Sequence, residues 1–203
     1  AASDIRRNHL LKTQLGARAG VISENPCRLD LEEALGFLTT PTFLLNVVCG
    51  PEGEARSAVA GDPLAAFRAG AELARGWFTV RVPRARVVVA SDVLPMTSSL
   101  YQAAKIAAAM APLVEANGAL ILVAECADGI EPVEIVNEAI FRTGVLPRLA
   151  PNVSIKLVSA RSSEEVSRTL VGHAVSVESV LADVSGSVVI VPRASQLIVE
   201  SYS

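Results

Sequence analysis

From residue 85 onward, short aliphatic runs alternate with longer segments of helical periodicity. The first run is "RVVVA" at 86–90, and comparable runs follow at regular intervals. The pattern predicts strands at 86–90, 119–124, 153–158, 187–191 and 196–200, and helices at 98–116, 132–143, 162–171 and 176–182. Strands and helices in this order indicate an α/β fold with a parallel, doubly wound sheet, which is a Rossmann-like domain.

The first 84 residues have a different pattern and predict the α/β tail of a second domain. A helix is expected at about 30–39, with Asp30 as its N-cap. The runs "TFLLNVVCG" and "EARSAVAG" predict a β-hairpin, and Asp62-Pro63 predicts the start of a further helix. We therefore expect two units, 1–84 and 85–203, with the boundary near Arg84.

Composition narrows the range of functions. Hydrophobic residues make up 51% of the chain and charged residues 19%, which fits a folded protein rather than a disordered one. The net charge of −3 and the scattered basic residues argue against a nucleic-acid partner. No apolar run is long enough for a membrane span, and no signal peptide is recognisable. The three widely spaced cysteines predict reduced thiols, so we expect a cytoplasmic protein without a membrane partner.

Gln102 and Lys105 form the most suggestive polar pair. Both belong to the first turns of the helix expected after the "RVVVA" strand, and their i, i+3 spacing places them on one face. A lysine is not favoured at a helix N-terminus for stability, whereas a bound anion there would satisfy both side chains. The simpler alternative is a solvated helix face on which Lys105 is merely exposed.

The remaining polar candidates have ordinary explanations. His9 could be a metal ligand, but one histidine alone cannot hold a metal, and a surface role is simpler. His173 lies between two expected helices and is interpreted as structural. Cys126, beside Glu125 at a strand end, could act as a nucleophile only with a base nearby. No nucleotide-binding glycine motif, P-loop, serine-hydrolase elbow or zinc-protease motif occurs.

A set of spaced motifs resembles the nickel-pincer-nucleotide lactate racemase family, in particular its carboxyl-terminal portion. Each motif is weak alone, but their order and spacing agree across about residues 5–130. The motifs are "RNH" at 7–9, "GVISENP" at 20–26, "LDLEEA" at 29–34, "LLNVV" at 44–48, "AVAGDPLAAFRAG" at 58–70, "LYQAAK" at 100–105 and "LILVAECADG" at 120–129.

The resemblance implies a cofactor and a set of roles. In that family a nickel-pincer nucleotide holds nickel through three of its own donors, and one protein histidine supplies the fourth ligand. His9 matches that histidine, so it would be the metal ligand and a cofactor-binding residue. Gln102 and Lys105 match a pair that closes over the cofactor and the substrate carboxylate, and Tyr101 adjoins them at the cofactor. The reaction would be reversible hydride transfer at the α-carbon of a 2-hydroxy acid.

Two departures from the family pattern bear on this expectation. The lysine that tethers the cofactor and the two catalytic histidines have no match here, so we expect residues 1–84 to be the incomplete carboxyl-terminal part of the catalytic domain. The chain alone would then be inactive, and an upstream segment or a partner chain would complete it. The loop "SDVLPMTSS" at 91–99 also differs, so another 2-hydroxy acid or a sugar acid fits as well as lactate.

The sequence therefore predicts part of a 2-hydroxyacid racemase or epimerase, an isomerase acting on a small-molecule substrate. An oligomer is compatible with the sequence. The alternative is a non-catalytic α/β domain that binds a small anion or serves in assembly.

Overall fold

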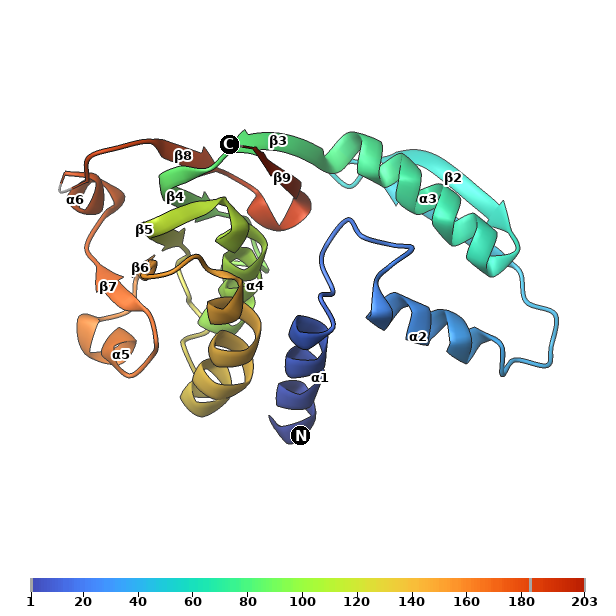
Figure 1. The fold of residues 1–203 in the computed structure, drawn as a ribbon, viewed down its shortest axis with the longest axis horizontal. Helices are drawn as coiled ribbons and strands as arrows, with labels where there is room; N and C mark the ends of the chain where they lie inside the picture. The colour runs from blue at the N-terminus through green and yellow to red at the C-terminus, as the bar shows by residue number, and fades with distance from the viewer. Residues whose placement is uncertain (1, 183, 203) are drawn as a thin grey trace.

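The computed structural model describes residues 2–182 and 184–202, except for the side chains of residues 2–5, 8 and 9. A five-stranded sheet and its helices form one part, and a β-hairpin with two helices extends from it (Figure 1). We call these parts the sheet unit and the hairpin unit. No helix in the described ranges has both the length and the apolar character needed to cross a membrane.

The sheet unit is built on five parallel strands in the order β7-β6-β5-β4-β8. Because the chain first moves outward from β4 and then returns to its other side, the sheet is doubly wound, as the sequence predicts. The strands are β4 (Ala85–Ser91), β5 (Val114–Val123), β6 (Ser154–Val158), β7 (Gly172–Ala174) and β8 (Val188–Val191).

Both faces of β4, an inner strand of the sheet, are buried, which explains its continuous apolar sequence. Val88 faces a core formed with α4 (Leu100–Met110) and η2 (Ile135–Val145). Val87 and Val89 face a smaller core that includes Val180. The shorter elements of this unit are η1 (Ala111–Leu113), η3 (Leu146–Arg148), α5 (Ser163–Ser167), α6 (Val177–Leu181) and η4 (Ala194–Gln196).

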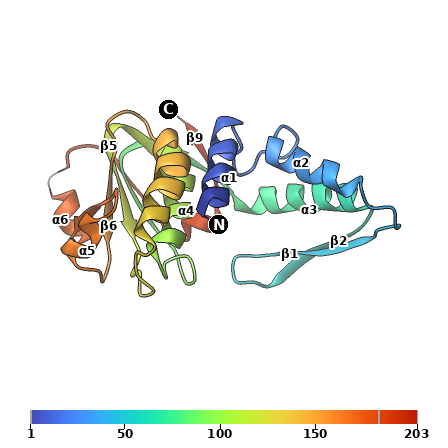
Figure 2. The same cartoon turned by 90° about the horizontal axis from the view of Figure 1, so that it is seen from below.

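The hairpin unit consists of an antiparallel pair of strands with a helix packed on it (Figure 2). Gly70 allows this close approach, since a Cβ at that position would lie 3.1 Å from Val59 Cγ2. The opposite face of β1 is open, and Leu45 is 70% exposed. The elements are α2 (Pro26–Leu35), β1 (Leu44–Cys49), β2 (Ala55–Gly61) and α3 (Pro63–Phe78), while the preceding helix α1 (Ala2–Gln14) lies against the sheet unit.

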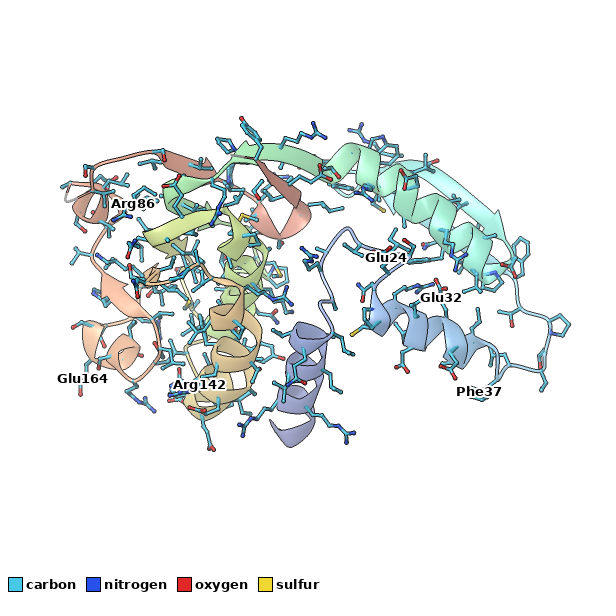
Figure 3. All side chains as sticks on the ribbon, in the orientation of Figure 1. Glu24, Glu32, Phe37, Arg86, Arg142 and Glu164 are labelled. Atoms are coloured by element: carbon cyan, nitrogen blue, oxygen red, sulfur yellow. The ribbon has the colours of Figure 1, made fainter. Side chains whose placement is uncertain are left out.

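A second, two-stranded sheet joins the two units. Strand β3 (Thr79–Pro83) leads from α3 to β4, and β9 (Ile198–Tyr202) pairs with it in parallel. Glu200 of β9 also lies 3.4 Å from Arg75 and 3.5 Å from Arg81; Figure 3 draws the side chains on the ribbon. The sequence pattern does not predict β3, and it does not reveal that the most C-terminal strand leaves the sheet unit.

Several predicted boundaries are wrong. The first is α2, which begins at Pro26 rather than near residue 30. Asn25, not Asp30, is its N-cap, because the Asn25 side chain accepts the backbone N–H of Cys27 at 3.1 Å. A proline in the first turn is pre-organised for this helix start.

The helix predicted at 98–116 is also too long. Regular α-helix ends at Met110, a single 3₁₀ turn contains Pro112, and β5 begins at Val114. The proline lacks the N–H that a continuing helix requires.

Three elements of the later sheet unit differ from the sequence prediction. The helix expected at 132–143 is a π-helix, η2. The helix expected at 162–171 is the short α5, and His173 lies in strand β7 rather than between two helices.

Candidate anion-binding site

The carboxyl edge of the sheet positions the first turn of α4. The loop that follows β4 is tied to the loop that follows β5 by backbone hydrogen bonds: the N–H of Cys126 donates to Thr97 O and that of Asp128 to Ser98 O. Ser99 caps the helix by accepting the N–H of Gln102 at 3.3 Å. These contacts fix the start of α4 and therefore the direction of the side chains in its first turns.

Gln102 and Lys105 contact each other directly. Lys105 Nζ donates to Gln102 Oε1 at 2.6 Å, and the ammonium lies 6.0 Å from the centre of the Tyr101 ring. The shared face predicted from their spacing is confirmed. The amide holds the flexible ammonium in one orientation, and Lys105 remains exposed to solvent.

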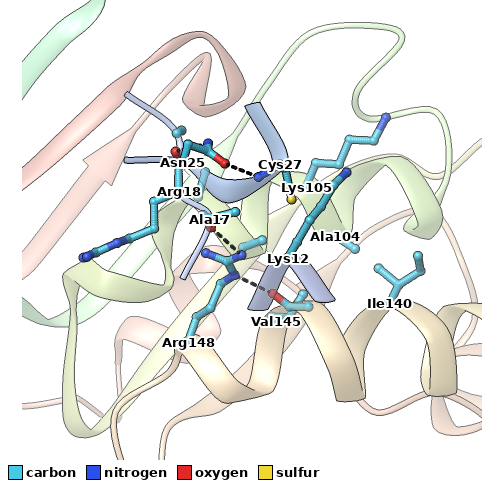
Figure 4. Close-up of a pocket in the computed structure, with 14 residues that line it drawn as sticks. Lys12, Ala17, Arg18, Asn25, Cys27, Ala104, Lys105, Ile140, Val145 and Arg148 are labelled. Carbon is cyan, nitrogen blue, oxygen red and sulfur yellow. Dashed lines mark hydrogen bonds between the residues drawn. The ribbon is translucent and has the colours of Figure 1, made fainter. Parts of the chain in front are cut away.

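Lys105 lines a pocket of about 410 Å³ between α1, the chain leading into α2, and the α4–η2 face of the sheet unit (Figure 4). Small side chains on α4 leave this space open. The residues that line the pocket are Lys12, Ala17, Arg18, Ala19, Asn25, Cys27, Ala104, Lys105, Ala108, Ala109, Ile140, Gly144, Val145 and Arg148. Its volume is within the range of small-molecule sites.

Four positive side chains line the pocket: Lys12, Arg18, Lys105 and Arg148. No aspartate or glutamate is among the lining residues. Arg148 is half-buried and donates to Gly144 O at 2.9 Å and to Ala17 O at 3.2 Å. Burial, and secondarily the positive charge of Arg18, lower the pKa of the Arg148 guanidinium. An anion in the pocket would offset this repulsion.

Helix α1 forms one wall because it docks on η2. Thr13 Oγ1 donates to Thr143 O at 2.6 Å, and the Thr143 hydroxyl donates in turn to Ala139 O at 2.7 Å. π-helical geometry is often found at functional sites. The docking brings Lys12, on the same helix, to the pocket that Lys105 lines.

The structure gathers only part of the predicted site. Lys105 lines the pocket, while Gln102 and Tyr101 reach it through their contacts with Lys105. His9 belongs to α1, but its side chain lies outside the described residues.

Sequence reasoning missed the other three cations of the pocket. Arg18 and Arg148 are 130 positions apart and meet only through the fold. Of these three cations, only Lys12 could have been placed at the site from the sequence, since it lies three positions after His9 and therefore shares its helix face.

Cys126 lacks the properties of a nucleophile. It is fully buried, and burial raises the pKa of its thiol to about 11, an effect that the positive charge of Arg161 only partly opposes. A thiol in this state is almost entirely protonated at neutral pH.

The switch point of the sheet, between β4 and β8, is occupied by protein contacts. Asp92 Oδ2 accepts the N–H of Ser195 at 2.6 Å. Arg193 reaches from the end of β8 to the hairpin turn, where it lies 2.6 Å from Glu52 Oε1 and 3.3 Å from Pro51 O. The pocket accordingly lies beside α4 and η2, and none of its lining residues comes from the loop at 91–99.

The metal-ligating and charged residues of the chain can be compared with what a nickel-pincer nucleotide requires of a protein. Within the described part of the chain, no group of three or more histidine, cysteine, aspartate or glutamate residues could hold a metal ion. A cofactor that brings three of its own donors needs only one protein ligand, and a nucleotide phosphate suits a pocket lined by cations. The cationic lining of the pocket therefore fits such a group in charge.

The fold and the pocket define a class of protein. It is a Rossmann-like α/β protein with a cationic pocket where its sheet unit meets a preceding helix. No protein-family model matches the sequence.

Comparison with individual proteins points to one family. The lactate racemase of Thermoanaerobacterium thermosaccharolyticum is 32% identical over 114 residues, which are 56% of this chain and 26% of that protein. The structure of the lactate racemase apoprotein from the same organism matches 90% of this chain and 51% of its own with a TM-score of 0.75 at 21% identity. A Thermotoga maritima protein structure matches 88% of this chain and 54% of its own with a TM-score of 0.63 at 14% identity.

These findings confirm the resemblance to the lactate racemase family and the α/β fold with a parallel sheet. The sequence similarity covers 114 residues, and the structural similarity shows the shared fold. The chain spans about half the length of the solved structures that it matches.

Proposed function

We propose that this chain is part of an isomerase, a racemase or epimerase that acts on a 2-hydroxy acid and uses a nickel-pincer nucleotide. The observation that carries the proposal is the cationic pocket with Lys105 fixed by Gln102 at its wall, in a chain similar to lactate racemase. A 2-hydroxy acid is an anion at neutral pH, so its carboxylate matches this pocket in charge.

The side chains then have separate tasks. Lys105 binds the substrate carboxylate, and Gln102 both orients the ammonium and offers its amide N–H groups. Tyr101 flanks the ammonium and contacts the cofactor. His9, in α1, is the protein ligand of nickel. When bound, the cofactor supplies a reversible acceptor for the hydride of the α-carbon.

Lys105 is exposed to solvent, so the apolar part of the pocket lining would exclude water from it only around a bound ligand. Ala104, Ala108, Ile140 and Val145 present small or apolar surface beside the cations. A site shielded in this way strengthens the attraction between Lys105 and a carboxylate, because the local dielectric is lower than in bulk water. Residues 1–84 and 85–203, both of which contribute residues to the pocket lining, would act as two domains that enclose the substrate between them.

Replacing Lys105 tests the proposal in the full-length protein loaded with cofactor. We expect Lys105→Ala to reduce kcat/KM for the 2-hydroxy acid by a factor of about 100 or more, since a charge-assisted contact is lost. Nickel content should remain nearly unchanged, because the metal ligand is on a different helix. Lys105→Arg, which keeps the charge, should retain more activity. Unchanged turnover in Lys105→Ala would remove Lys105 from the site.

A second function is favoured by the same pocket if the cofactor is absent. The chain would then be a non-catalytic α/β domain that binds a small anion or serves in assembly. Purified full-length protein without nickel, and with no interconversion of 2-hydroxy acid stereoisomers, would support this alternative. Bound nickel with a visible charge-transfer absorption would support the racemase.

A further inference from the structure

A second pocket lies at the amino ends of the sheet strands, beside α6, and we call it the amino-edge pocket. Its volume is about 280 Å³, and Val87 and Val180 in its lining belong to the smaller core. Ala104 and Ile140, which line the cationic pocket, belong to the larger core on the other face of the sheet. The sheet therefore separates the two pockets, and the amino-edge pocket lies apart from the proposed racemase site.

Lys156 is the unusual residue of the amino-edge pocket. It belongs to β6, an inner strand of the parallel sheet, and its register neighbours are Ile121 and Gly172. Side chains at such positions are normally apolar, because both faces of a parallel sheet are covered. Lys156 is half-buried, and among the described residues no carboxylate lies within ion-pair distance of its ammonium. Since a charge without a partner is costly to bury, the stability of the fold does not explain this lysine.

Arg86 places a second positive charge at the same pocket, beside α6 (Figure 3). Its guanidinium donates from Nη1 to Ala116 O at 2.8 Å, and its backbone N–H donates to Ser187 Oγ at 3.1 Å. Gly186 packs on the side-chain stem, since a Cβ at this glycine would lie 3.0 Å from Arg86 Cβ. A guanidinium carries several N–H donors, and within the described ranges only this one side-chain hydrogen bond is made. Arg86 is thus held in place with donors available for a ligand.

Neutral hydrogen-bond donors complete the lining. Asn117 Oδ1 accepts Asn152 Nδ2 at 3.0 Å, which orients the Asn117 amide and leaves its NH2 group for another partner. Ser154 and Ser185 add hydroxyl groups, and none of the described lining residues is an aspartate or a glutamate. Two cations, an amide and two hydroxyls around one cavity match an anion with several acceptor oxygens.

We propose that the amino-edge pocket binds a phosphate group, either as free phosphate or as the phosphate of a small ester. A phosphate monoester carries about 1.5 to 2 negative charges at neutral pH, which matches the charges of Lys156 and Arg86. A carboxylate has a single charge and fewer oxygens, so it would engage fewer of the donors. Val180 and Val184 would contact the organic part of an ester. This site does not depend on the proposed function.

Hydrogen–deuterium exchange of the full-length protein with increasing inorganic phosphate tests the site, at an ionic strength held constant with potassium chloride. We expect phosphate to slow the exchange of backbone amides in 117–119 and 184–187, which border the pocket. Acetate at the same concentrations should protect these segments less. In Lys156→Met, the phosphate concentration for half-maximal protection should rise about tenfold or more, because a charge-assisted contact is lost.

Matched variants separate this site from the cationic pocket. Lys105→Met removes a lysine on the other side of the sheet and should leave the protection of 117–119 and 184–187 unchanged. Lys156→Arg keeps the positive charge and should restore most of the protection. Without phosphate, Lys156→Met should melt at a temperature no lower than the wild-type protein, because it removes a half-buried charge. Its loss of binding would then not be a loss of fold.

Glycerol 3-phosphate distinguishes the two sources of the phosphate group. Half-maximal protection at a lower concentration than with inorganic phosphate assigns the pocket to an ester, and an equal or higher concentration assigns it to free phosphate. The proposal is overturned if neither compound protects 117–119 and 184–187 in the wild-type protein. It is overturned equally if Lys156→Met is protected as the wild-type protein is, or if acetate protects as well as phosphate.

Discussion

The contact between Lys105 and Gln102 shows how one hydrogen bond prepares a flexible side chain for binding. A free lysine loses much rotational freedom when it is fixed on a ligand. Here the amide oxygen holds the ammonium at 2.6 Å before any ligand arrives, and part of that entropic cost is met during folding.

Cys126 gives a residue-scale prediction for alkaline conditions. Its folded pKa is about 11 against an ordinary value of 9.0, because burial disfavours the thiolate. Its stabilising contribution is complete below pH 9 and is lost as the pH rises toward 11. We expect the wild-type protein to lose on the order of 2 kcal/mol more unfolding free energy than Cys126→Ala across this interval.

Urea unfolding at several pH values measures this difference. Cys49→Ala is the matched control, because it removes an exposed thiol and keeps the buried Cys126, so this variant should lose stability with pH as the wild-type protein does. Equal pH dependence in the wild-type protein and Cys126→Ala would contradict the prediction.

For individual residues, the sequence predicted contacts between near neighbours in the chain well and contacts between distant positions poorly. The shared face of Gln102 and Lys105 follows from helical spacing alone. The approach of Arg148 to Ala17 joins residues 131 positions apart, and it depends on how α1 docks. The positions of scattered basic residues in the sequence do not indicate which of them lie close together in the fold.

Among the elements, α3 illustrates a helix whose start is fixed by two residues. Asp62 Oδ1 accepts the N–H groups of Leu64 at 3.1 Å and Ala65 at 3.0 Å, and Pro63 follows the cap. Both signals are visible in the sequence, and the predicted helix start is confirmed.

Removing this cap should weaken the hairpin unit. We expect Asp62→Ala to lower the unfolding free energy by about 1 kcal/mol, since two backbone N–H groups lose their partner. Asp62→Asn keeps an acceptor oxygen and should cost less. Thermal unfolding followed by circular dichroism measures both variants, and equal melting temperatures for Asp62→Ala and the wild-type protein would show that the cap contributes nothing.

Other element boundaries depended on signals that compete. Asp30 and Asn25 both precede helical residues, and the structure uses Asn25 because Pro26 already favours a helix start. The apolar sequence around Pro112 hid a helix end and a strand start within a few residues. Periodicity alone could not reveal that η2 would be π-helical.

For the whole molecule, the pairing of β9 with β3 determines how the two units are joined. The parallel, doubly wound character of the sheet unit followed from the alternation of strands and helices in the sequence. The sequence did not predict that β9 pairs with β3, because a short apolar strand near the end of such a unit would ordinarily extend the main sheet.

Deleting residues 198–203 tests the role of this pairing. We expect the backbone amides of 79–83 to exchange with solvent at least tenfold faster, because their partner strand is lost. The amides of β4 and β5 should stay protected, since their neighbours are intact. Hydrogen–deuterium exchange with mass spectrometry measures both regions.

Glu200→Gln serves as the control for this deletion. It removes the ion pairs with Arg75 and Arg81 but leaves the strand pairing in place. Unchanged exchange of 79–83 after the deletion would show that β3 is held by other contacts.

The paired strands β3 and β9 also have a mechanical consequence. Two hydrogen-bonded strands form a ribbon, and a ribbon bends readily across its flat face but resists stretching and bending within its own plane. The hairpin unit should therefore move toward or away from the sheet unit as a hinge about one axis, rather than rotate in all directions. The ion pair between Arg193 and Glu52 would restrain this hinge motion, because it links the sheet unit to the hairpin turn.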